Sequence, residues 1–452
     1  MKKIYLFTIA LLFVGNGAIQ AQVEKNDNKK ETEITVKDAQ GKQVTIDLPE
    51  AMTQELDSLM QLYNTKKNLK PDTNCNMPDV NPVYDKTVYM KRLSMLPTVL
   101  EMPYNDVVQT FIDRYSGHLR NSVSYMLGAQ NFYMPIFEEA LDTYGLPLEL
   151  KYLPVIESAL NPCAVSRVGA TGLWQFMIKT AKKYGLTVNS LVDERRDPIK
   201  SSYAAAHYLS DLYKLYGDWN LVIAAYNCGE DKISKAMHRS KQTDYWQIYP
   251  YLPEETKGYV PAFIAANYIM NYYCDHNICP MTSELPAKTD TILVNKDINF
   301  EQISHVLGID IDQLRTLNPQ YRHDLVNGSW RPSSLRLPTL MITKFIDNED
   351  SIYAYKPAEV TAKRTEVEVN NEEPVVSKSR SYSRHRGNSD SSKYTRKKKK
   401  NKRKHVIKSV TVGDGDTLSE IAERHGTTVS KLKKLNKIDG STIRAGKKIK
   451  VK

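Results

Sequence analysis

The chain has 452 residues, of which 41% are hydrophobic and 25% are charged. This composition excludes a wholly disordered or collagen-like chain, and the length allows roughly two to four domains with an ample buried core. The formal net charge of +11 is unevenly spread, because residues 377–408 hold fourteen Lys or Arg against one acid. The chain before this stretch is net acidic, so the basic character belongs to the C-terminal end.

The N-terminus has the pattern of an export signal over residues 1–21. Two lysines precede an apolar run from Ile4 to Val14, and small and polar residues follow up to Ala21. This order is typical of a secretory signal peptide. We therefore expect an exported protein, periplasmic or associated with the cell envelope, with no lipobox cysteine and no transmembrane helix in the mature chain.

The region of residues 22–87 is polar and receives no functional assignment. Within it, residues 34–48 alternate as a strand, a turn at Gln40-Gly41 and a second strand, and a helix is expected before the Pro-rich stretch at 71–82.

From residue 88 to 285 the hydrophobic pattern is helical, which predicts an all-α domain. Helix boundaries are marked by capping residues, such as Asp197-Pro198 at the start of one helix and Gly217 at its end.

A repeat appears when the C-terminus is laid over the region near residue 300 with a constant offset of 118. The matched positions are Leu418, Ile421, Gly426, Val429, Leu432, Leu435 and Asn436 with Phe300, Ile303, Gly308, Ile311, Leu314, Leu317 and Asn318. Each copy has two short helical patterns divided at the glycine and ends in an alternating strand. The repeat predicts two small modules, at residues 288–340 and 409–452.

Residues 346–408, between the modules, are first acidic and then rich in Ser, Arg and Lys. With few large aliphatic side chains, such a stretch cannot offset its chain entropy, so a disordered basic linker is expected. Its run from Arg396 to Lys404 has the composition of a nucleic-acid-binding patch. In an exported chain we instead expect electrostatic contact with anionic envelope polymers, and no nucleic acid.

The chain contains five cysteines, at Cys75, Cys163, Cys228, Cys274 and Cys279. An oxidising compartment allows up to two disulfides, and the sequence leaves their pairing open. The group Cys274, His276 and Cys279 has a metal-site spacing without a second set of ligands, so a disulfide or a plain buried thiol is favoured. No metal and no cofactor are expected.

The segment from Gly145 to Pro162 places an acid on an apolar helix face. At 100° per residue, Glu157 shares one stripe with leucines 146, 150, 153 and 160. Burial disfavours the charged form of a carboxyl, so the pKa of Glu157 should be raised and the group could act as a general acid. Pro154 predicts a kink three residues earlier. The alternative is a structural Glu157 that pairs with a buried base or a loop.

Further motifs follow this acid. They are Ser166, GATGLWQF at residues 169–176, AAYNCG at 224–229 and ETKGYVP at 255–261. At these residues the chain resembles the soluble lytic transglycosylase family of lysozyme-like, peptidoglycan-cleaving enzymes, most closely its membrane-bound lytic murein transglycosylase D branch. The motifs stand in the family's order and at its spacing, over about residues 150–265.

The resemblance implies a lysozyme-like all-α catalytic domain at residues 88–285 in which Glu157 is the sole catalytic carboxyl. It would cleave the bond between N-acetylmuramic acid and N-acetylglucosamine and leave 1,6-anhydro ends, in cell-wall turnover. Ser166 and Gln175 would bind the sugar chain. Tyr226 and Tyr259 would stand near the acid, and Asn227 would support their loop.

The two repeats resemble LysM modules, small α+β units of βααβ order that bind peptidoglycan glycan strands. Gly415, Asp416 and Thr417 match the opening motif in the second copy. The first copy has residues 297–299, Asp-Ile-Asn, in their place, so this module is degenerate and its glycan binding is open.

The sequence departs from the family pattern at two places, and two alternatives to the transglycosylase function stay open. Glu230-Asp231 replaces the Pro-Gly of many family members, and Cys163 and Cys228 are a possible disulfide pair. One alternative is a lysozyme-type muramidase in which Asp193, Glu194 or Asp197 positions a water. The other is a non-catalytic peptidoglycan-binding protein.

Overall fold

The computed structural model describes most of the chain between the predicted signal and the linker, and parts of the C-terminal module. The described residues are 32–37, 43–53, 69–283, 285–286, 288–358, 409–412, 418–425, 427–438, 443 and 447–451. Their buried apolar side chains form three cores, one in the helical domain (residues 32–286), one in the first module (288–358) and one in the second module (409–451). Within these residues, no helix is long and apolar enough to cross a membrane.

The helical domain is built as the periodicity predicts. Its α-helices are α2 (Lys86–Ser94), α3 (Asp106–Ser116), α4 (Arg120–Thr143), α5 (Leu153–Ser158), α6 (Ile178–Lys183), α7 (Pro198–Tyr216), α8 (Trp219–Cys228), α9 (Glu230–Ser240), α10 (Tyr245–Ile248) and α11 (Glu254–Tyr272). Its 3₁₀ segments are η1 (Glu50–Thr53), η3 (Leu148–Tyr152), η4 (Tyr249–Tyr251) and η5 (Tyr273–His276). The predicted caps of α7 are confirmed, since Asp197 accepts from the first backbone amides and Gly217 ends the helix with φ 63°.

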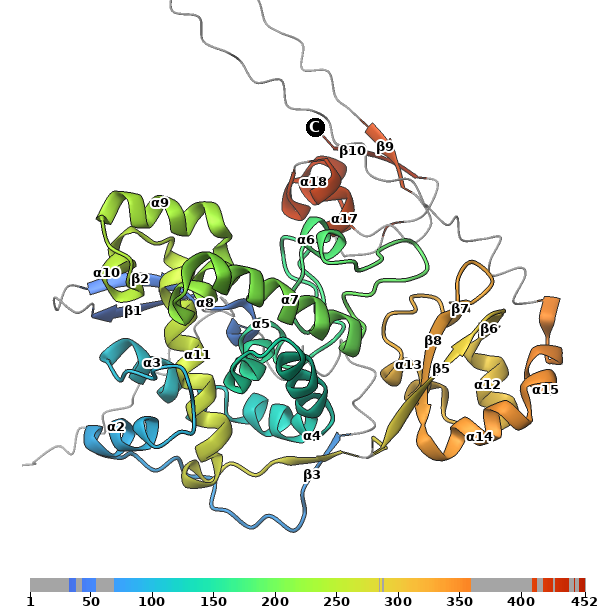
Figure 1. Cartoon of the computed structure of the whole chain (residues 1–452), viewed down its shortest axis with the longest axis horizontal. Coiled ribbons are helices and arrows are strands. Elements are labelled where there is room, and N and C mark those ends of the chain that lie inside the picture. The colour runs from blue at the N-terminus through green and yellow to red at the C-terminus, as the bar shows by residue number, and fades with distance from the viewer. Residues whose placement is uncertain are drawn as a thin grey trace, which may run out of the picture. The chain divides into compact units, whose positions relative to one another are not determined.

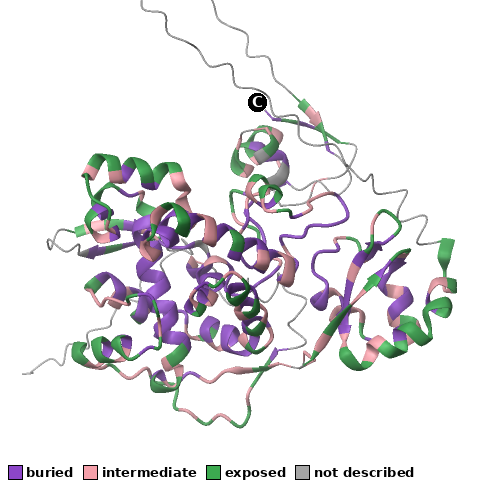
Figure 2. Ribbon diagram, in the orientation of Figure 1, coloured by how far each residue is buried: buried purple, intermediate pink, exposed green. Residues whose placement is uncertain are grey.

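Helix α11 is the central element of this domain (Figures 1 and 2). It is buried along most of its length, whereas α9 is exposed on one side. Helices α3, α5 and α8 pack against it. A helix that is apolar on nearly every side requires such a central position, because no single face of it can be left in water.

The described residues before residue 88 contribute side chains to the core of the helical domain, which corrects the predicted boundary at that residue. The predicted hairpin forms from β1 (Glu33–Lys37) and β2 (Gln43–Asp47), and packs on α3 and α11. Gly258 on α11 lacks a side chain where β2 passes, since a Cβ there would lie 2.9 Å from the Asp47 carbonyl oxygen. The helix expected before residue 71 falls outside the described residues.

A disulfide and a short sheet join the start of the domain to its end. Cys75 pairs with Cys279, and β3 (Leu69–Pro71) pairs with β4 (Met281–Ser283). The suggested bridge between Cys163 and Cys228 is wrong, because both are free thiols. In the suspected metal cluster, Cys279 is thus oxidised, and buried His276 contacts Tyr268 Oη through Nε2.

Both modules have the predicted repeat. The first contains β5 (Thr289–Val294), β6 (Asp297–Asn299), α12 (Phe300–Leu307), α13 (Ile311–Leu317), β7 (Leu325–Asn327) and β8 (Ser333–Pro338); the second contains β9 (Ser409–Thr411), α17 (Leu418–Arg424), α18 (Val429–Asn436) and β10 (Lys448–Lys450). Strand β5 pairs with β8, and β9 with β10, both antiparallel. Asn318 and the matching Asn436 both use their side-chain amides to tie the second helix to the last strand.

The first module extends beyond the predicted end at residue 340. Helices α14 (Thr339–Asp347) and α15 (Glu349–Ala354) bury Phe345 and Ile352 in its core. Residues 346–354, expected to begin the linker, are therefore folded, because these two apolar side chains complete a core that the βααβ unit leaves open. The remainder of the predicted linker, from residue 359 to 408, lies outside the described residues.

Candidate active site

Glu157 lies one residue before the end of a very short helix. The helical segment, in which a kink was predicted at Pro154, consists of the 3₁₀ segment η3 followed by α5, and Pro154 stands in the first turn of α5. Ala159 and Leu160 then take left-handed backbone angles, with φ 50° and 61°. Such angles are costly for side chains other than glycine and are found where the surrounding structure holds them, often at functional sites.

The predicted apolar stripe is buried, whereas Glu157 itself is only partly buried. Leu150, Leu153 and Leu160 have no measurable exposure. Ser158 follows the acid and donates its hydroxyl to Leu173 O at 2.9 Å, which joins α5 to the 163–176 loop. The carboxyl is thus held at a fixed place with access to solvent.

Tyr259, on the central helix α11, donates its hydroxyl to Glu157 Oε1. The tyrosine is 2% exposed. Burial raises the pKa of Tyr259, and the negative charge of Glu157 raises that pKa further. The hydroxyl therefore stays protonated at neutral pH and remains a donor that orients the carboxyl and favours its ionised form.

Tyr226, from the last turns of α8, is the second tyrosine near the acid. Burial raises its pKa first, and the charge of Glu157 adds to the rise. Its hydroxyl donates to Trp174 O at 2.8 Å and not to the carboxyl. The structure thus brings together Glu157, Tyr226 and Tyr259, from three helices that are distant in sequence.

Ser166 and Gln175 lie on the 163–176 loop, and the contacts of both side chains brace that loop. Ser166 Oγ accepts from Ala170 N at 2.9 Å. Gln175 has φ 47° and donates through Nε2 to Gly172 O at 2.8 Å. Their contact with a sugar chain stays a prediction.

Asn227 joins the end of α8 to the start of α11. Its Oδ1 accepts from Thr256 Oγ1 at 2.8 Å, and its Nδ2 donates to Glu255 at 3.4 Å. Since Tyr226 and Tyr259 stand on these same two helices, this contact fixes the spacing of the tyrosines around the acid.

The three acids considered as partners for a hydrolytic water are engaged elsewhere. Asp193 is fully buried between Arg195 and Arg322, and Glu194 binds Lys200 and Arg331. Asp197 caps α7. Their carboxylates hold the structure together, which is the role expected for buried charges.

The sequence did not predict the side chains that hold the 163–176 loop in place beside the candidate acid. Ser158 and Arg195 both hold carbonyl groups of the 163–176 loop. Trp174 is 1% exposed and donates Nε1 to Ser202 Oγ at 2.9 Å. The available signal in the sequence was the run of charged residues from Asp193 to Asp197, which contains Arg195. The glycan-binding candidates Gly415, Asp416 and Thr417 lie outside the described residues.

Comparison with known proteins identifies three domains in the chain. Residues 134–249 match the Transglycosylase SLT domain, residues 288–354 the Lytic transglycosylase MltD, LysM-like domain, and residues 410–452 the LysM domain. Membrane-bound lytic murein transglycosylase D of Escherichia coli (strain K12) is 28% identical over 312 residues, which is 68% of this chain and 60% of that protein.

Two further similarities cover less of the chain. Invasion protein IagB of Salmonella typhi is 30% identical over 141 residues, 29% of this chain and 86% of that protein. The crystal structure of the 70 kDa soluble lytic transglycosylase of Escherichia coli is 22% identical, with a TM-score of 0.29 over 37% of this chain and 31% of that one.

Proposed function

Since the chain belongs to the lytic transglycosylase family, with an SLT domain followed by LysM modules, we propose that it cleaves peptidoglycan. The bond broken joins N-acetylmuramic acid to N-acetylglucosamine, and the product carries a 1,6-anhydro end. The proposed setting is cell-wall turnover in the periplasm or cell envelope, which residues 1–21 would reach as an export signal.

In the proposed reaction Glu157 acts twice. As an acid it gives its proton to the glycosidic oxygen while the bond to the anomeric carbon breaks, and the substrate's N-acetyl group supports the positive charge. As a carboxylate it then takes the proton of the muramyl C6 hydroxyl, whose oxygen closes on the anomeric carbon. No water is consumed, and the intramolecular hydroxyl has a large effective concentration.

The observation that carries this proposal is the bond from Tyr259 to Glu157. A neutral hydroxyl aimed at the carboxyl stabilises the carboxylate that forms when the proton leaves, while the apolar surroundings of α5 favour the protonated acid. The two effects together suit a group that must be both acid and base. The engagement of Asp193, Glu194 and Asp197 supports a single-carboxyl reaction over a two-carboxylate hydrolysis.

Glycan binding is assigned to the second module, through Gly415, Asp416 and Thr417. Tethering a catalytic domain to an insoluble polymer raises its local concentration there. The basic residues 377–408 add a salt-sensitive attraction to anionic envelope polymers.

Glu157→Gln tests the proposal, because the amide keeps the shape of the side chain and has no acidic proton to deliver. Purified peptidoglycan is digested and the fragments are weighed by mass spectrometry, with Glu139→Gln, an exposed acid on α4, as the matched control. Glu157→Gln should lower cleavage at least about a hundredfold and still sediment with peptidoglycan, whereas Glu139→Gln should be active.

The product masses separate the alternatives. Anhydro ends are one water lighter than the reducing ends that a muramidase leaves. Undiminished cleavage by Glu157→Gln removes the role of that residue, and absence of cleavage by the unmodified protein favours a binding protein.

A further inference from the structure

The segment from residue 187 to 197 is shared between the helical domain and the first module. Leu191 and Val192 are buried in the core of the module. The main chains also pair, since Asp193 N donates to Gln320 O and Arg322 N donates to Leu191 O, both at 2.9 Å. The module therefore takes part of the helical domain into its own core.

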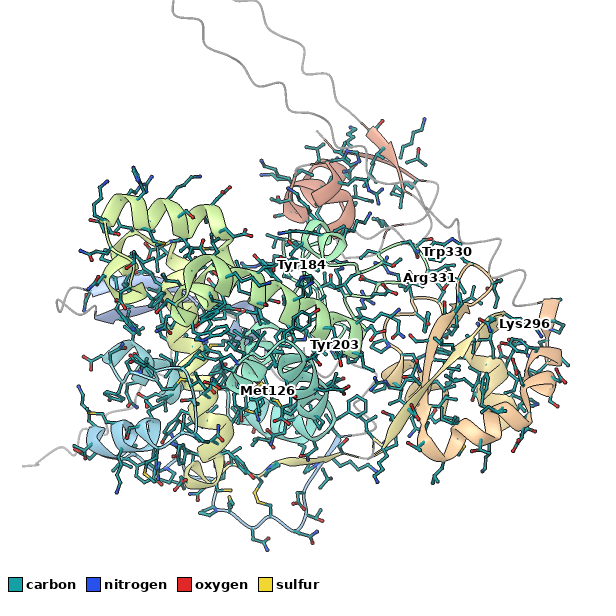
Figure 3. All side chains as sticks on the ribbon, viewed as in Figure 1. Met126, Tyr184, Tyr203, Lys296, Trp330 and Arg331 are labelled. Atoms are coloured by element: carbon teal, nitrogen blue, oxygen red, sulfur yellow. A yellow bond between two sulfur atoms is a disulfide. The ribbon has the colours of Figure 1, made fainter. Side chains whose placement is uncertain are left out.

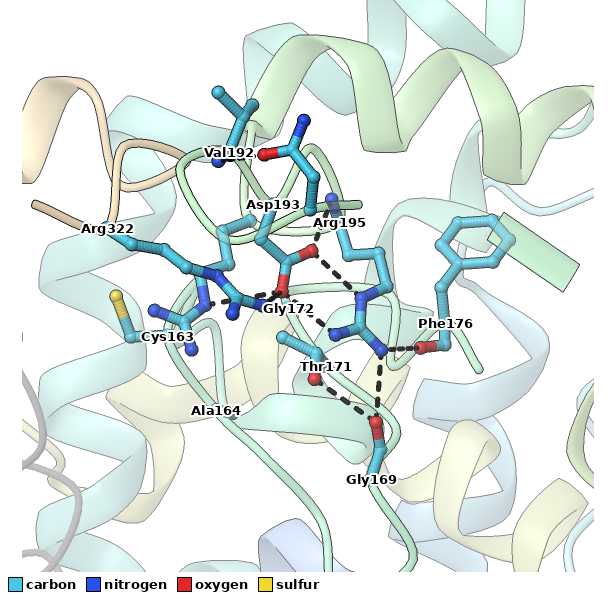
Figure 4. A network of polar contacts seen from close by, with 12 residues as sticks. Cys163, Ala164, Gly169, Thr171, Gly172, Phe176, Val192, Asp193, Arg195 and Arg322 are labelled. Carbon is cyan, nitrogen blue, oxygen red and sulfur yellow. Dashed lines mark hydrogen bonds and ion pairs between the residues drawn. The ribbon is translucent and has the colours of Figure 1, made fainter. Parts of the chain in front are cut away.

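A buried ion pair lies directly beside this shared backbone (Figure 4). Asp193 has no exposure, and its Oδ2 accepts from Arg195 Nη2 and from Arg322 Nη2, each at 2.9 Å. Burial works to raise the pKa of Asp193, but the charges and hydrogen bonds of the arginines outweigh it and lower that pKa. The carboxylate is thus charged, and its two hydrogen-bonding arginines come from the helical domain and from the first module.

Arg195 continues from this pair to the 163–176 loop. Its Nη1 donates to Gly169 O at 3.1 Å and to Phe176 O at 3.2 Å. The loop also touches the Arg195 backbone, because a Cβ on Gly172 would lie 1.9 Å from Arg195 O. One guanidinium group thereby holds both ends of the turn that carries Gln175.

This turn is joined to the candidate acid and its tyrosine. Leu173 O accepts from Ser158, the residue after Glu157, and Trp174 O accepts from Tyr226. A continuous set of hydrogen bonds therefore runs from Arg322 in the module, through Asp193 and Arg195, to the loop against which the acid is set.

Resting on the proposed function, we infer that the first module positions the active site, with Arg322 as the positioning residue. Arg322 supplies the second cation of Asp193 and so fixes the carboxylate that orients Arg195. Without it the buried carboxylate would lose one of the two hydrogen bonds at Oδ2 and keep Arg195 and the more distant Arg196, at 3.9 Å, and Arg195 would hold the 163–176 loop less firmly. The first module is in this view a working part of the active site.

A second ion pair supports the same docking. Arg331, on the segment between β7 and β8, binds Glu194, and its guanidinium lies 5.0 Å from the ring centre of Trp330 (Figure 3). Glu194 in turn accepts from Thr187 N. The shared segment is thus fixed to the module on both sides of Asp193.

The experiment compares the full-length protein with Arg322→Gln and Arg322→Lys. The matched control is Arg315→Gln, since Arg315 is an arginine of the same module whose partners, Asp312 and Asp324, both lie in that module. Hydrogen exchange of the amides in residues 163–176 reports the loop directly, and kcat and KM on soluble glycan strands report the site.

Exchange in the loop should rise about tenfold in Arg322→Gln and by less in Arg322→Lys, which keeps the charge but loses the two-pronged donor. The kcat value should fall in the same order, with a smaller change in KM, and Arg315→Gln should match the unmodified protein in both. Should Arg322→Gln lose its fold, Arg322→Lys carries the test.

Unchanged loop exchange in folded Arg322 variants, or an equal rise in Arg315→Gln, overturns the inference. The exchange measurement needs no substrate. It therefore decides the role of the module even if the unmodified protein fails to cleave peptidoglycan, a result that would count against the proposed function alone.

Discussion

Tyr259→Phe should change the pH dependence of cleavage and leave the fold intact. The ring of Tyr259 is buried and phenylalanine fills the same volume, so the substitution removes little more than the hydroxyl that donates to Glu157. A hydrogen bond to a charged group is worth about 1.5–3 kcal/mol. Because Glu157 is only partly buried, the hydrogen bond from Tyr259 should be worth the lower end of this range. That free energy corresponds to a change of about one unit in the pKa of Glu157.

The direction of the shift follows from which form the hydroxyl stabilises. Tyr259 donates to the carboxylate, so its loss disfavours the ionised form and raises the pKa of Glu157. The proposed reaction begins with protonated Glu157, and activity should fall as the pH rises through that pKa. In Tyr259→Phe this alkaline limb should move about one unit to higher pH, while the maximal kcat drops about tenfold because the carboxyl is less well oriented.

The assay is kcat on soluble glycan strands measured across a pH series. Tyr226→Phe is the matched control, since the hydroxyl of Tyr226 donates to a backbone carbonyl and its removal should leave the alkaline limb in place. A limb that stays fixed in Tyr259→Phe, or moves to lower pH, refutes the assigned role of this hydrogen bond.

Two further predictions concern the ends of the helical domain and the second module. Cys279→Ser opens the bridge to Cys75, which closes a loop of 204 residues, and should lower the free energy of unfolding by about 2–5 kcal/mol in urea denaturation; Cys274→Ser, at an exposed free thiol, should change it little. Truncation after residue 358 should reduce activity on whole sacculi more than on short soluble glycans, because it removes the tethered second module. Equal losses on both substrates would contradict a tethering role.

In the first module, the sequence predicted the core but not the extension that follows it. The repeat predicted its βααβ core correctly, since periodicity and the glycine between the helices are local signals. The extension through α14 and α15 lies beyond the stretch that the repeat compares, so the repeat gave no signal for it. Only the burial of Phe345 and Ile352 in the structure makes residues 346–354 part of the fold.

A similar limit applies around the candidate acid. The apolar stripe was predicted from local spacing, and its leucines are buried. The end of α5 after Ser158 was not predicted, because it depends on a bond to Leu173 and on left-handed angles that the surrounding structure enforces. Asp193 was considered as a reactive acid for the same reason: one of its two hydrogen-bonding arginines, Arg322, is 129 residues away and leaves no local signal.

The hairpin of β1 and β2 sets a limit on how early in translation the core of the helical domain can form. Its contacts on α11 join the first described residues of the domain to a helix that begins at Glu254, so this part of the core cannot close until more than two hundred residues have followed the hairpin. Contacts between residues so far apart in sequence slow folding, because the chain loses entropy before these contacts form and stabilise it. In a nascent chain the hairpin would therefore wait for α11 to be synthesised before its face on that helix is covered.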